Sequence, residues 1–307
     1  MLRLLAALLV LAATGARAGV VQEVRALVLS GQLEQARAVL AKSRAHDVPA
    51  AERLDAHSQL ARGELKAGLL DAALTDALDV HAQAVAELAH RELDQEPHLP
   101  RALGTAIEVE AQASAARGDR SSAVAQLRQE IARWSRTSLA TRLRKNLHLL
   151  SLEGQAPPLL LLEPHLGPSA PTLQSLKSKV VLLFFWAHWC PDCKEAAQAV
   201  ARQQAALRSR GLVVLAPTQL YGTVAGGREA APEEELRWIE QVRRSAYVSL
   251  LDAPAPTAAA NFTAWGASTT PTLVVLGRDG KVVLYHPGGM GDAELRAVLE
   301  KALGAYE

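Results

Sequence analysis

Cys190 and Cys193 are the two cysteines of this 307-residue chain, and Pro and Asp stand between them. The pair follows an apolar run over residues 180–186 and precedes a helical pattern that begins at Pro191, so Cys190 is expected at the N-terminus of a helix. Unpaired backbone N–H groups at such a point favour the thiolate, which is the nucleophilic form of cysteine. Two intervening residues let the second sulfur reach the first and resolve a mixed disulfide. The spacing therefore predicts thiol–disulfide exchange, with Cys190 as the exposed attacking thiol and Cys193 as the buried resolving thiol.

Other uses of a cysteine pair fit this sequence less well. A disulfide that closes so short a loop adds little stability. A structural zinc ion needs four ligands, and the chain has no second Cys-x-x-Cys motif, so His165 and His188 would complete only a poor site. A peroxiredoxin-like site needs Thr or Ser three residues before the cysteine, where Ala187 stands. We therefore expect a redox-active disulfide, with no metal and no organic cofactor.

Strand-like and helix-like segments alternate from residue 179 onward. Strands are expected at residues 180–186, 212–216, 248–251, 272–276 and 281–285, and helices at residues 191–209, 233–244 and 292–303. Asp279-Gly280, between the last two strands, is a strong hairpin signal. This order predicts an α/β domain with a mostly parallel central sheet, helices on both faces and an antiparallel hairpin at one edge.

Residues 153–304 resemble the thioredoxin-like proteins, and specifically the exported TlpA/ResA-type thiol–disulfide oxidoreductases. The matching features are the lead-in Gly154-Gln-Ala-Pro157, the buried strand before Trp186, the Trp189-Cys190-x-x-Cys193 motif and the segment Ser268-Thr-Thr270-Pro271-Thr272. The resemblance implies a thioredoxin fold in which Pro271 is cis and lies against the two cysteines. It also implies that the backbone of Thr270 is available to pair with substrate polypeptide as an added strand. The implied substrate-binding residues are Trp189, Pro191, Thr270 and Pro271.

The same resemblance implies a direction and a set of partners. Proteins of this type usually serve as extracytoplasmic reductants, so disulfide reduction is the implied activity. The implied partners are protein thiol or disulfide substrates and an upstream redox protein that keeps the cysteine pair reduced. A second interpretation stays open, in which the chain is a helical-repeat interaction or scaffold protein and the thioredoxin-like domain is not used catalytically.

Several residues near the motif depart from the family pattern. Phe184 stands where related proteins often carry a buried Asp or Asn, so the proton acceptor for the resolving thiol is unassigned. Glu195 is close enough in sequence for that role, and a solvated helix carboxylate is the alternative. His188 would stabilise a Cys190 thiolate as an imidazolium, or it lies at the surface without such a role. Asp192, between the cysteines, would raise a thiol pKa and oppose that effect.

Residues 19–150 are rich in Ala, Leu, Arg, Glu and Gln, which favour helices. The pattern Gly-x-x-x-x-Ala occurs three times, at Gly31–Ala36, Gly68–Ala73 and Gly118–Ala123. In each copy the glycine is expected to end one helix in a left-handed cap, and the alanine to let the next helix pack closely. The region resembles a degenerate tetratricopeptide-type array of helical hairpins. Either a protein partner binds its concave face, or the array is a spacer without a specific ligand.

The remaining segments complete the expected domain organisation. Residues 1–18 have the pattern of a signal peptide, with a positive start, an apolar run over residues 4–13 and small residues before a cleavage site after Ala18. An uncleaved membrane anchor is the alternative, although the apolar run is shorter than the roughly 20 residues of a spanning helix. Residues 151–178 are expected to form a linker and lead-in, and residues 179–307 the thioredoxin-like domain. The signal predicts an exported, periplasmic or extracytoplasmic protein, and the formal net charge of +1 argues against a nucleic-acid partner.

Overall fold

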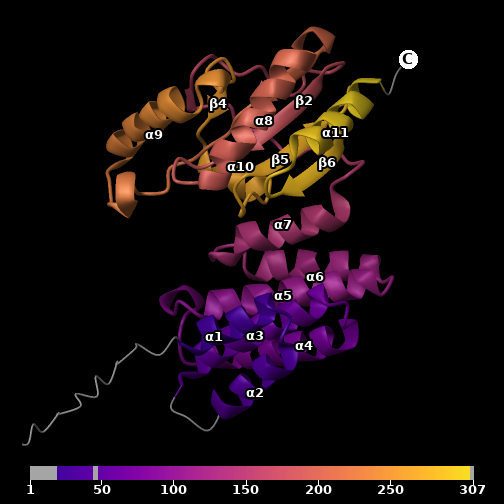
Figure 1. The fold of residues 1–307 in the computed structure, drawn as a ribbon, viewed down its shortest axis with the longest axis vertical. Helices are drawn as coiled ribbons and strands as arrows, with labels where there is room; N and C mark the ends of the chain where they lie inside the picture. Colours follow the sequence, from indigo (N-terminus) through magenta and orange to yellow (C-terminus); the bar gives the residue numbers. More distant parts are fainter. Residues whose placement is uncertain (1–18, 44–47, 305–307) are drawn as a thin grey trace, which may run out of the picture.

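The computed structural model describes residues 19–43 and 48–304, which form a helical half and an α/β half (Figure 1). The two halves lie one after the other along the long axis of the molecule, and helix α7 (Leu139–Ser151) lies between them. The predicted signal peptide, residues 1–18, lies outside the described residues. No helix in the described ranges is both long and apolar enough to cross a membrane.

The helical half is built from helices joined by short turns. The helices before α7 are α1 (Val20–Leu29), α2 (Leu33–Ser43), α3 (Ala50–Lys66), α4 (Leu70–Glu87), the 3-10 turn η1 (Leu93–Gln95), α5 (Leu99–Ala116) and α6 (Arg120–Arg133). The predicted left-handed caps are confirmed, since φ is +75° at Gly31, +77° at Gly68 and +95° at Gly118. After each glycine the next N–H bonds back into the helix, as from Gln32 to the carbonyl of Leu27 at 2.8 Å. The alanines that follow the caps are fully buried, namely Ala36, Ala73 and Ala123.

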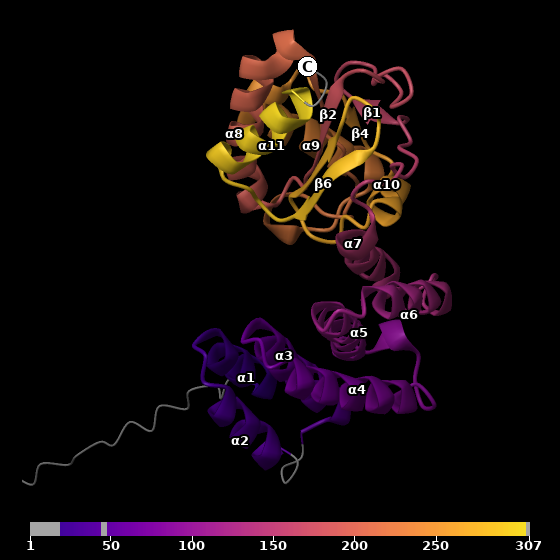
Figure 2. The ribbon, with the colours of Figure 1, turned by 90° about the vertical axis from the view of Figure 1, so that its right-hand side faces the viewer.

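The odd-numbered helices of this half form one layer. Helix α3 contacts α1 and α5, and α5 in turn contacts α7. The even-numbered helices pack on this layer, α4 against α3 and α5, and α6 against α5 and α7. Figure 2 shows α7 between α6 and the α/β half. The predicted architecture of helical hairpins is therefore present, with a core of Leu, Ile and Ala side chains that includes the fully buried Leu99, Leu103, Ile107 and Leu127.

A four-stranded sheet in the order β3-β2-β5-β6 is the centre of the α/β half. Its strands are β2 (Val180–Phe185), β3 (Leu212–Leu215), β5 (Thr272–Leu276) and β6 (Val282–Pro287). Strands β2 and β3 run parallel, whereas β2–β5 and β5–β6 are antiparallel pairs. The predicted hairpin at Asp279-Gly280 is confirmed. The expectation of a mostly parallel sheet is wrong, because one pair of the three is parallel and the sheet is mixed.

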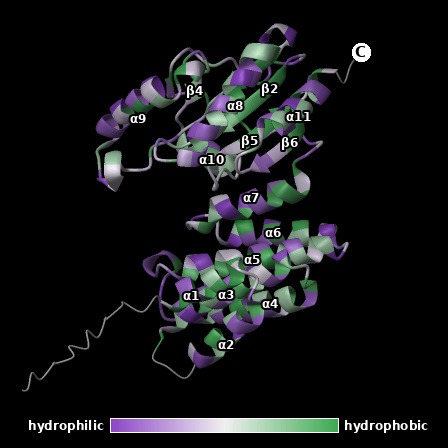
Figure 3. Cartoon of the chain, in the orientation of Figure 1, coloured by the Kyte–Doolittle hydropathy of each residue, from purple (hydrophilic) through white to green (hydrophobic). Residues whose placement is uncertain are grey.

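Strand β2 is buried on both faces, and in Figure 3 it is coloured hydrophobic along its length. Leu182, Phe184 and Trp186 cluster with side chains of α8 (Pro191–Leu207), α9 (Pro232–Ala246) and α11 (Asp292–Gly304). The alternate residues Leu183 and Phe185 pack on the other face with residues of α10 (Ala259–Ala264) and the segment that follows it. The predicted arrangement of helices on both faces is therefore confirmed.

One predicted strand is not a strand. Residues 248–251 fall in the 3-10 turn η4 (Val248–Leu250), where Val248 is 57% exposed and Leu250 is buried. A half-buried strand needs alternating buried and exposed side chains over several residues, and this segment is too short to give that pattern. The nearest strand is β4 (Ala255–Pro256), which pairs with β1 (His165–Leu166) outside the main sheet. The remaining 3-10 turns are η2 (Arg208–Arg210) and η3 (Ala225–Gly227).

The segment after α7 runs along the sheet edge. Gly154 donates its N–H to the carbonyl of Val282 at 2.7 Å, and Val282 donates to the carbonyl of Gln155 at 3.0 Å. At the end of α7, Nε2 of His148 lies 2.9 Å from the carbonyl oxygen of Ala264. The ring of Tyr285, on β6, lies edge-on to His148 with 5.4 Å between ring centroids. These contacts join the two halves through polar and aromatic groups.

The two halves approach each other closely at Gly266. This residue has φ of +61°, and a Cβ added to it would lie 2.4 Å from the backbone nitrogen of Lys145 and 2.7 Å from the carbonyl carbon of Arg144. The hydroxyl of Tyr285 lies 3.0 Å from the carbonyl oxygens of both Trp265 and Gly266. Only glycine fits here without moving α7 or the turn.

We predict that Gly266→Ala lowers the free energy of unfolding by about 3–5 kcal/mol, because left-handed backbone strain adds to overpacking against α7. The matched control is Gly31→Ala, which has a similar φ of +75° but no atom within 4 Å of the added Cβ. The control should lose only about 1–2 kcal/mol. Urea unfolding followed by tryptophan fluorescence measures both, and equal losses would contradict the proposed close contact.

Candidate active site

Cys190 and Cys193 form a disulfide at the junction between β2 and α8. Cys190 is the N-cap residue of α8, and its Sγ accepts a hydrogen bond from the backbone N–H of Cys193 at 3.0 Å. Pro191 occupies the first helical position, where its missing N–H costs nothing. This position of a sulfur at a helix N-terminus favours a thiolate when the disulfide is reduced.

Burial of the two cysteines differs in part from the prediction. Cys193 is fully buried as expected, but Cys190, predicted to be exposed, is only 2% exposed. The reason is the loop that ends at Pro271: the carbonyl oxygen of Thr270 lies 3.5 Å from Sγ of Cys190. The peptide bond between Thr270 and Pro271 is cis, which confirms the predicted conformation. The cis-proline loop (residues 268–271) therefore covers the disulfide.

A cavity of about 210 Å³ lies beside this loop. Trp189 forms part of its wall, is 55% exposed and stands edge-on to Tyr221, with ring centroids 5.4 Å apart. Thr270 and Phe262 complete the wall on the α/β side. Thr141, on α7, lines the same cavity, so the helical half contributes directly to the surroundings of the cysteine pair.

His188 is buried rather than at the surface. Its Nε2 lies 3.2 Å from Oε1 of Glu235, and both side chains are 1% exposed. Burial lowers the pKa of His188 below its ordinary value, although the hydrogen bond to Glu235 opposes that shift. Burial thus disfavours the imidazolium form of His188 that would stabilise a thiolate.

Glu235 was missed from the sequence, and it holds the loop beside the cysteines. Its Oε1 accepts the backbone N–H of Tyr221 at 2.6 Å, and its Oε2 accepts that of Gly222 at 2.8 Å. Three consecutive glutamates after Pro232 have the pattern of a solvated helix start. The sequence does indicate that Glu235 faces inward, because it lies one helical turn before the buried Ile239 and therefore on the inner face of α9.

The other acidic residues near the motif lie at the surface. Asp192 and Glu195 are exposed on α8, and neither has a hydrogen bond or ion pair with a cysteine in the described part of the chain. Phe184 is fully buried in the apolar cluster that includes both cysteines. His165 pairs with Glu163 at 2.8 Å. Within residues 19–43 and 48–304, no group of three or more His, Cys, Asp or Glu side chains is placed to hold a metal ion.

Residues 170–303 match the model of a thioredoxin-like domain family. Among solved structures, a thiol:disulfide interchange protein from Chlorobium tepidum TLS is 20% identical, with a TM-score of 0.37, over 50% of this chain and 99% of its own. An exposed lipoprotein thioredoxin from Streptococcus pneumoniae strain TIGR4 is 21% identical, with a TM-score of 0.36, over 45% of this chain and 97% of its own. A DsbF homologue from Corynebacterium diphtheriae is 16% identical, with a TM-score of 0.38, over 48% and 87%. The comparison with curated proteins found no match.

We predict that Glu235→Gln destabilises the protein by about 2 kcal/mol, because a buried carboxylate that accepts two backbone N–H groups is replaced by a group with one acceptor oxygen. The matched control is Glu233→Gln, an exposed residue of the same helix turn, which should leave the urea midpoint unchanged. The altered Tyr221 loop should also change the fluorescence of the neighbouring Trp189. Identical unfolding curves for the two variants would contradict the anchoring role of Glu235.

Proposed function

We propose, from the thioredoxin-like domain at residues 170–303, that this chain is an exported thiol–disulfide oxidoreductase that reduces disulfides in protein substrates. One observation carries the proposal: Sγ of Cys190 accepts the N–H of Cys193 at a helix start and faces the carbonyl of Thr270 in the cis-proline loop. That arrangement joins an activated sulfur, a resolving sulfur and a peptide edge for a substrate strand.

The proposed reaction begins with the reduced pair. The Cys190 thiolate attacks one sulfur of the substrate disulfide, so a mixed disulfide forms and the other substrate sulfur leaves as a thiolate. Cys193 then attacks Sγ of Cys190 and releases the second substrate sulfur, while its proton passes to a departing thiolate. The substrate gains two electrons and two protons, one proton from Cys193 and one from solvent, and the enzyme is left with the Cys190–Cys193 disulfide. An upstream dithiol protein returns the pair to the reduced form.

Substrate binding is assigned to the residues around the disulfide. The backbone of Thr270, which is partly exposed, would pair with an extended substrate segment, and cis Pro271 fixes the direction of that edge. Trp189 is exposed beside the same cavity and offers a flat apolar surface, and Pro191 is exposed at the start of α8. Thr270, Trp189 and Pro191 form the accessible part of the proposed substrate-binding surface, and Pro271 lies buried beneath it.

Electrostatics support reduction rather than oxidation. A strongly oxidising pair needs a reduced form that is unusually stabilised. Burial disfavours the imidazolium form of His188, and the negative charge of Asp192, two residues from Cys190, disfavours a thiolate. The helix start is then the remaining stabilising influence, and the proposed direction is electron donation to substrates. Glu195 is exposed on α8 and is not proposed as the proton acceptor.

Export is proposed from residues 1–18, and periplasmic or other extracytoplasmic location follows from it, with a retained anchor as the alternative.

A second candidate function is favoured by the position of Thr141 at the active-site cavity. In that reading the helical half, residues 19–150, is a tetratricopeptide-like interaction module that binds a protein partner, and residues 151–178 connect it to the redox domain at residues 179–307. The two functions are compatible, because a bound partner would lie next to Cys190.

We predict that Cys190→Ser abolishes reduction of insulin disulfides by dithiothreitol-supplied electrons, because no attacking thiolate remains. Cys193→Ser should instead accumulate mixed disulfides with substrate, since the resolving step is lost. Non-reducing gel electrophoresis detects the trapped species, and an insulin turbidity assay measures turnover. Full turnover by the Cys190 variant would end the proposal.

A further inference from the structure

A second cavity, of about 640 Å³, lies between the helical half and the cis-proline loop. Its floor is the inner face of the odd-numbered helices, with residues from α1, α3, α5 and α7. Ser268 and Thr269 of the cis-proline loop close it on the α/β side. On α3 the lining residues Gln59, Arg62, Gly63 and Lys66 follow helical spacing, so one face of the helix is turned into the cavity.

The lining of this cavity is strongly cationic. It includes six Lys or Arg side chains, namely Arg25, Arg62, Lys66, Arg101, Arg142 and Lys145, and one carboxylate, Glu108. The whole chain has a formal net charge of only +1, so positive charge is concentrated here. A concave surface of one sign attracts ligands of the opposite sign.

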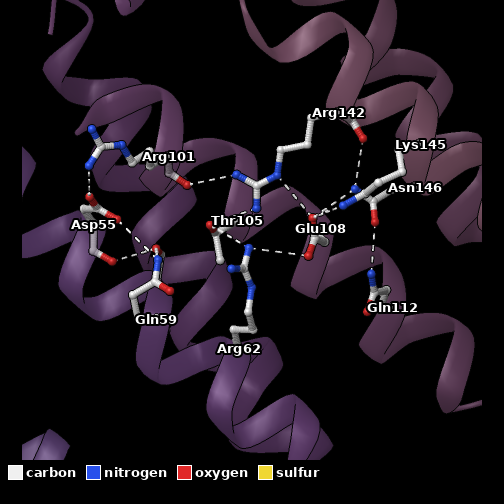
Figure 4. Close-up of polar contacts among 11 residues, drawn as sticks. Asp55, Gln59, Arg62, Arg101, Thr105, Glu108, Gln112, Arg142, Lys145 and Asn146 are labelled. Carbon is white, nitrogen blue, oxygen red and sulfur yellow. Dashed lines mark hydrogen bonds and ion pairs between the residues drawn. The ribbon is translucent and has the colours of Figure 1, made fainter. Parts of the chain in front are cut away.

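Glu108 is shared by three of these cations (Figure 4). Its Oε2 accepts from Nε of Arg142 at 3.2 Å and from Nζ of Lys145 at 3.3 Å, and its Oε1 lies 3.4 Å from Arg62. Burial opposes ionisation of Glu108, but the three cations outweigh it and hold the pKa at about 2. Arg62 and Arg142 also both donate to the hydroxyl of Thr105, at 3.1 and 2.9 Å. These three cations are thus held in place, and the single carboxylate of Glu108 does not neutralise them. Arg101 is paired separately with the buried Asp55, at 3.6 Å.

Room for this cluster is built into α5. Gly104 lies in the middle of that helix, and a Cβ there would come within 2.9 Å of Nη1 of Arg142 and of Cδ2 of Leu139. A helix-interior glycine costs about 1 kcal/mol relative to alanine. Its presence lets the Arg142 guanidinium lie across α5 toward the cavity.

Two cations of the cavity are free for a ligand. Arg25 and Lys66 are exposed and have no ion pair or side-chain hydrogen bond within the residues that the structure describes. Leu29, also in the lining, is 72% exposed. The cavity therefore combines unpaired positive charge with an apolar contact, which suits a polypeptide segment better than a small ion.

The cationic cavity and the cavity beside Trp189 share one lining residue of the cis-proline loop. Ser268 lines both this cavity and the smaller one beside Trp189, and Thr270, two residues further, contacts Cys190. A substrate segment paired with Thr270 would therefore lie two residues from the loop residue that the two cavities share.

We propose that this cavity binds an acidic segment of the protein substrate, so that disulfides with Asp or Glu near the reacting cysteine are selected. The inference rests on the proposed function, whose substrate class it names. The helical half then determines the substrate specificity of the enzyme, because its inner face binds negatively charged substrate segments.

The test uses the full oxidised chain and a fluorescein-labelled peptide with a central Ser in place of Cys and three Glu residues on each side. A matched peptide carries Gln at the same positions. We expect the Glu peptide to bind about tenfold more tightly at low salt, and Arg25→Gln/Lys66→Gln to lose most of that preference. The matched control is Arg128→Gln/Arg136→Gln, which removes two exposed cations outside the cavity and should bind like the unmodified chain.

Equal affinity for the Glu and Gln peptides, or equal weakening by both double variants, would overturn the inference. Displacement of the Glu peptide by sulfate, but not by chloride at the same ionic strength, would also overturn it and indicate a site for free anions.

A separate experiment gives the reduced chain the Cys versions of both peptides as glutathione mixed disulfides. Faster release of glutathione from the Glu peptide supports the inference. Equal rates of glutathione release from both peptides overturn it and leave the proposed function intact. Glu-selective binding without any release overturns the proposed function, and with it the assignment of the ligand as a redox substrate.

Discussion

The backbone of α7 at Arg144 and Lys145 lies so close to Gly266 that no side chain fits between them. This contact fixes the position of the helical half relative to the turn that leads into the cis-proline loop. His148 and Tyr285 reinforce it, because each contacts the carbonyl groups of that turn. The wall of the active-site cavity and the floor of the cationic cavity both depend on where α7 sits. A small displacement of α7 would therefore change both cavities without contacting either cysteine.

Around the cysteines the structure balances opposing influences on the thiolate. The start of α8 stabilises negative charge on Cys190, whereas Asp192 opposes it and burial disfavours the imidazolium form of His188. The carboxylate of Glu235 accepts the backbone N–H groups of Tyr221 and Gly222, so Glu235 positions a loop and does not take part in the exchange.

Local features of this chain could be predicted well from the sequence. The CxxC pair, the apolar run of β2, the hairpin at Asp279-Gly280 and the three glycine caps depend on neighbouring residues alone. The direction of β5 relative to β2 does not depend on neighbouring residues alone, because it is set by the path of the chain between the two strands. The sheet is therefore mixed rather than mostly parallel. Coverage of Cys190 likewise depends on Thr270, 80 residues away, and the role of Glu235 depends on a loop 13 residues before it. The cationic cavity collects residues from four helices and the cis-proline loop, so no single segment carries its pattern.

The most direct test of the account is the reduction potential of the Cys190–Cys193 pair in the full chain. It is measured by equilibrating the protein at graded ratios of reduced to oxidised dithiothreitol or glutathione and then alkylating the free thiols. The account predicts a value near that of thioredoxin, about −270 mV, because the reduced form receives no unusual stabilisation. A value near the strongly oxidising end, about −120 mV, would contradict it and indicate a catalyst that forms disulfides instead.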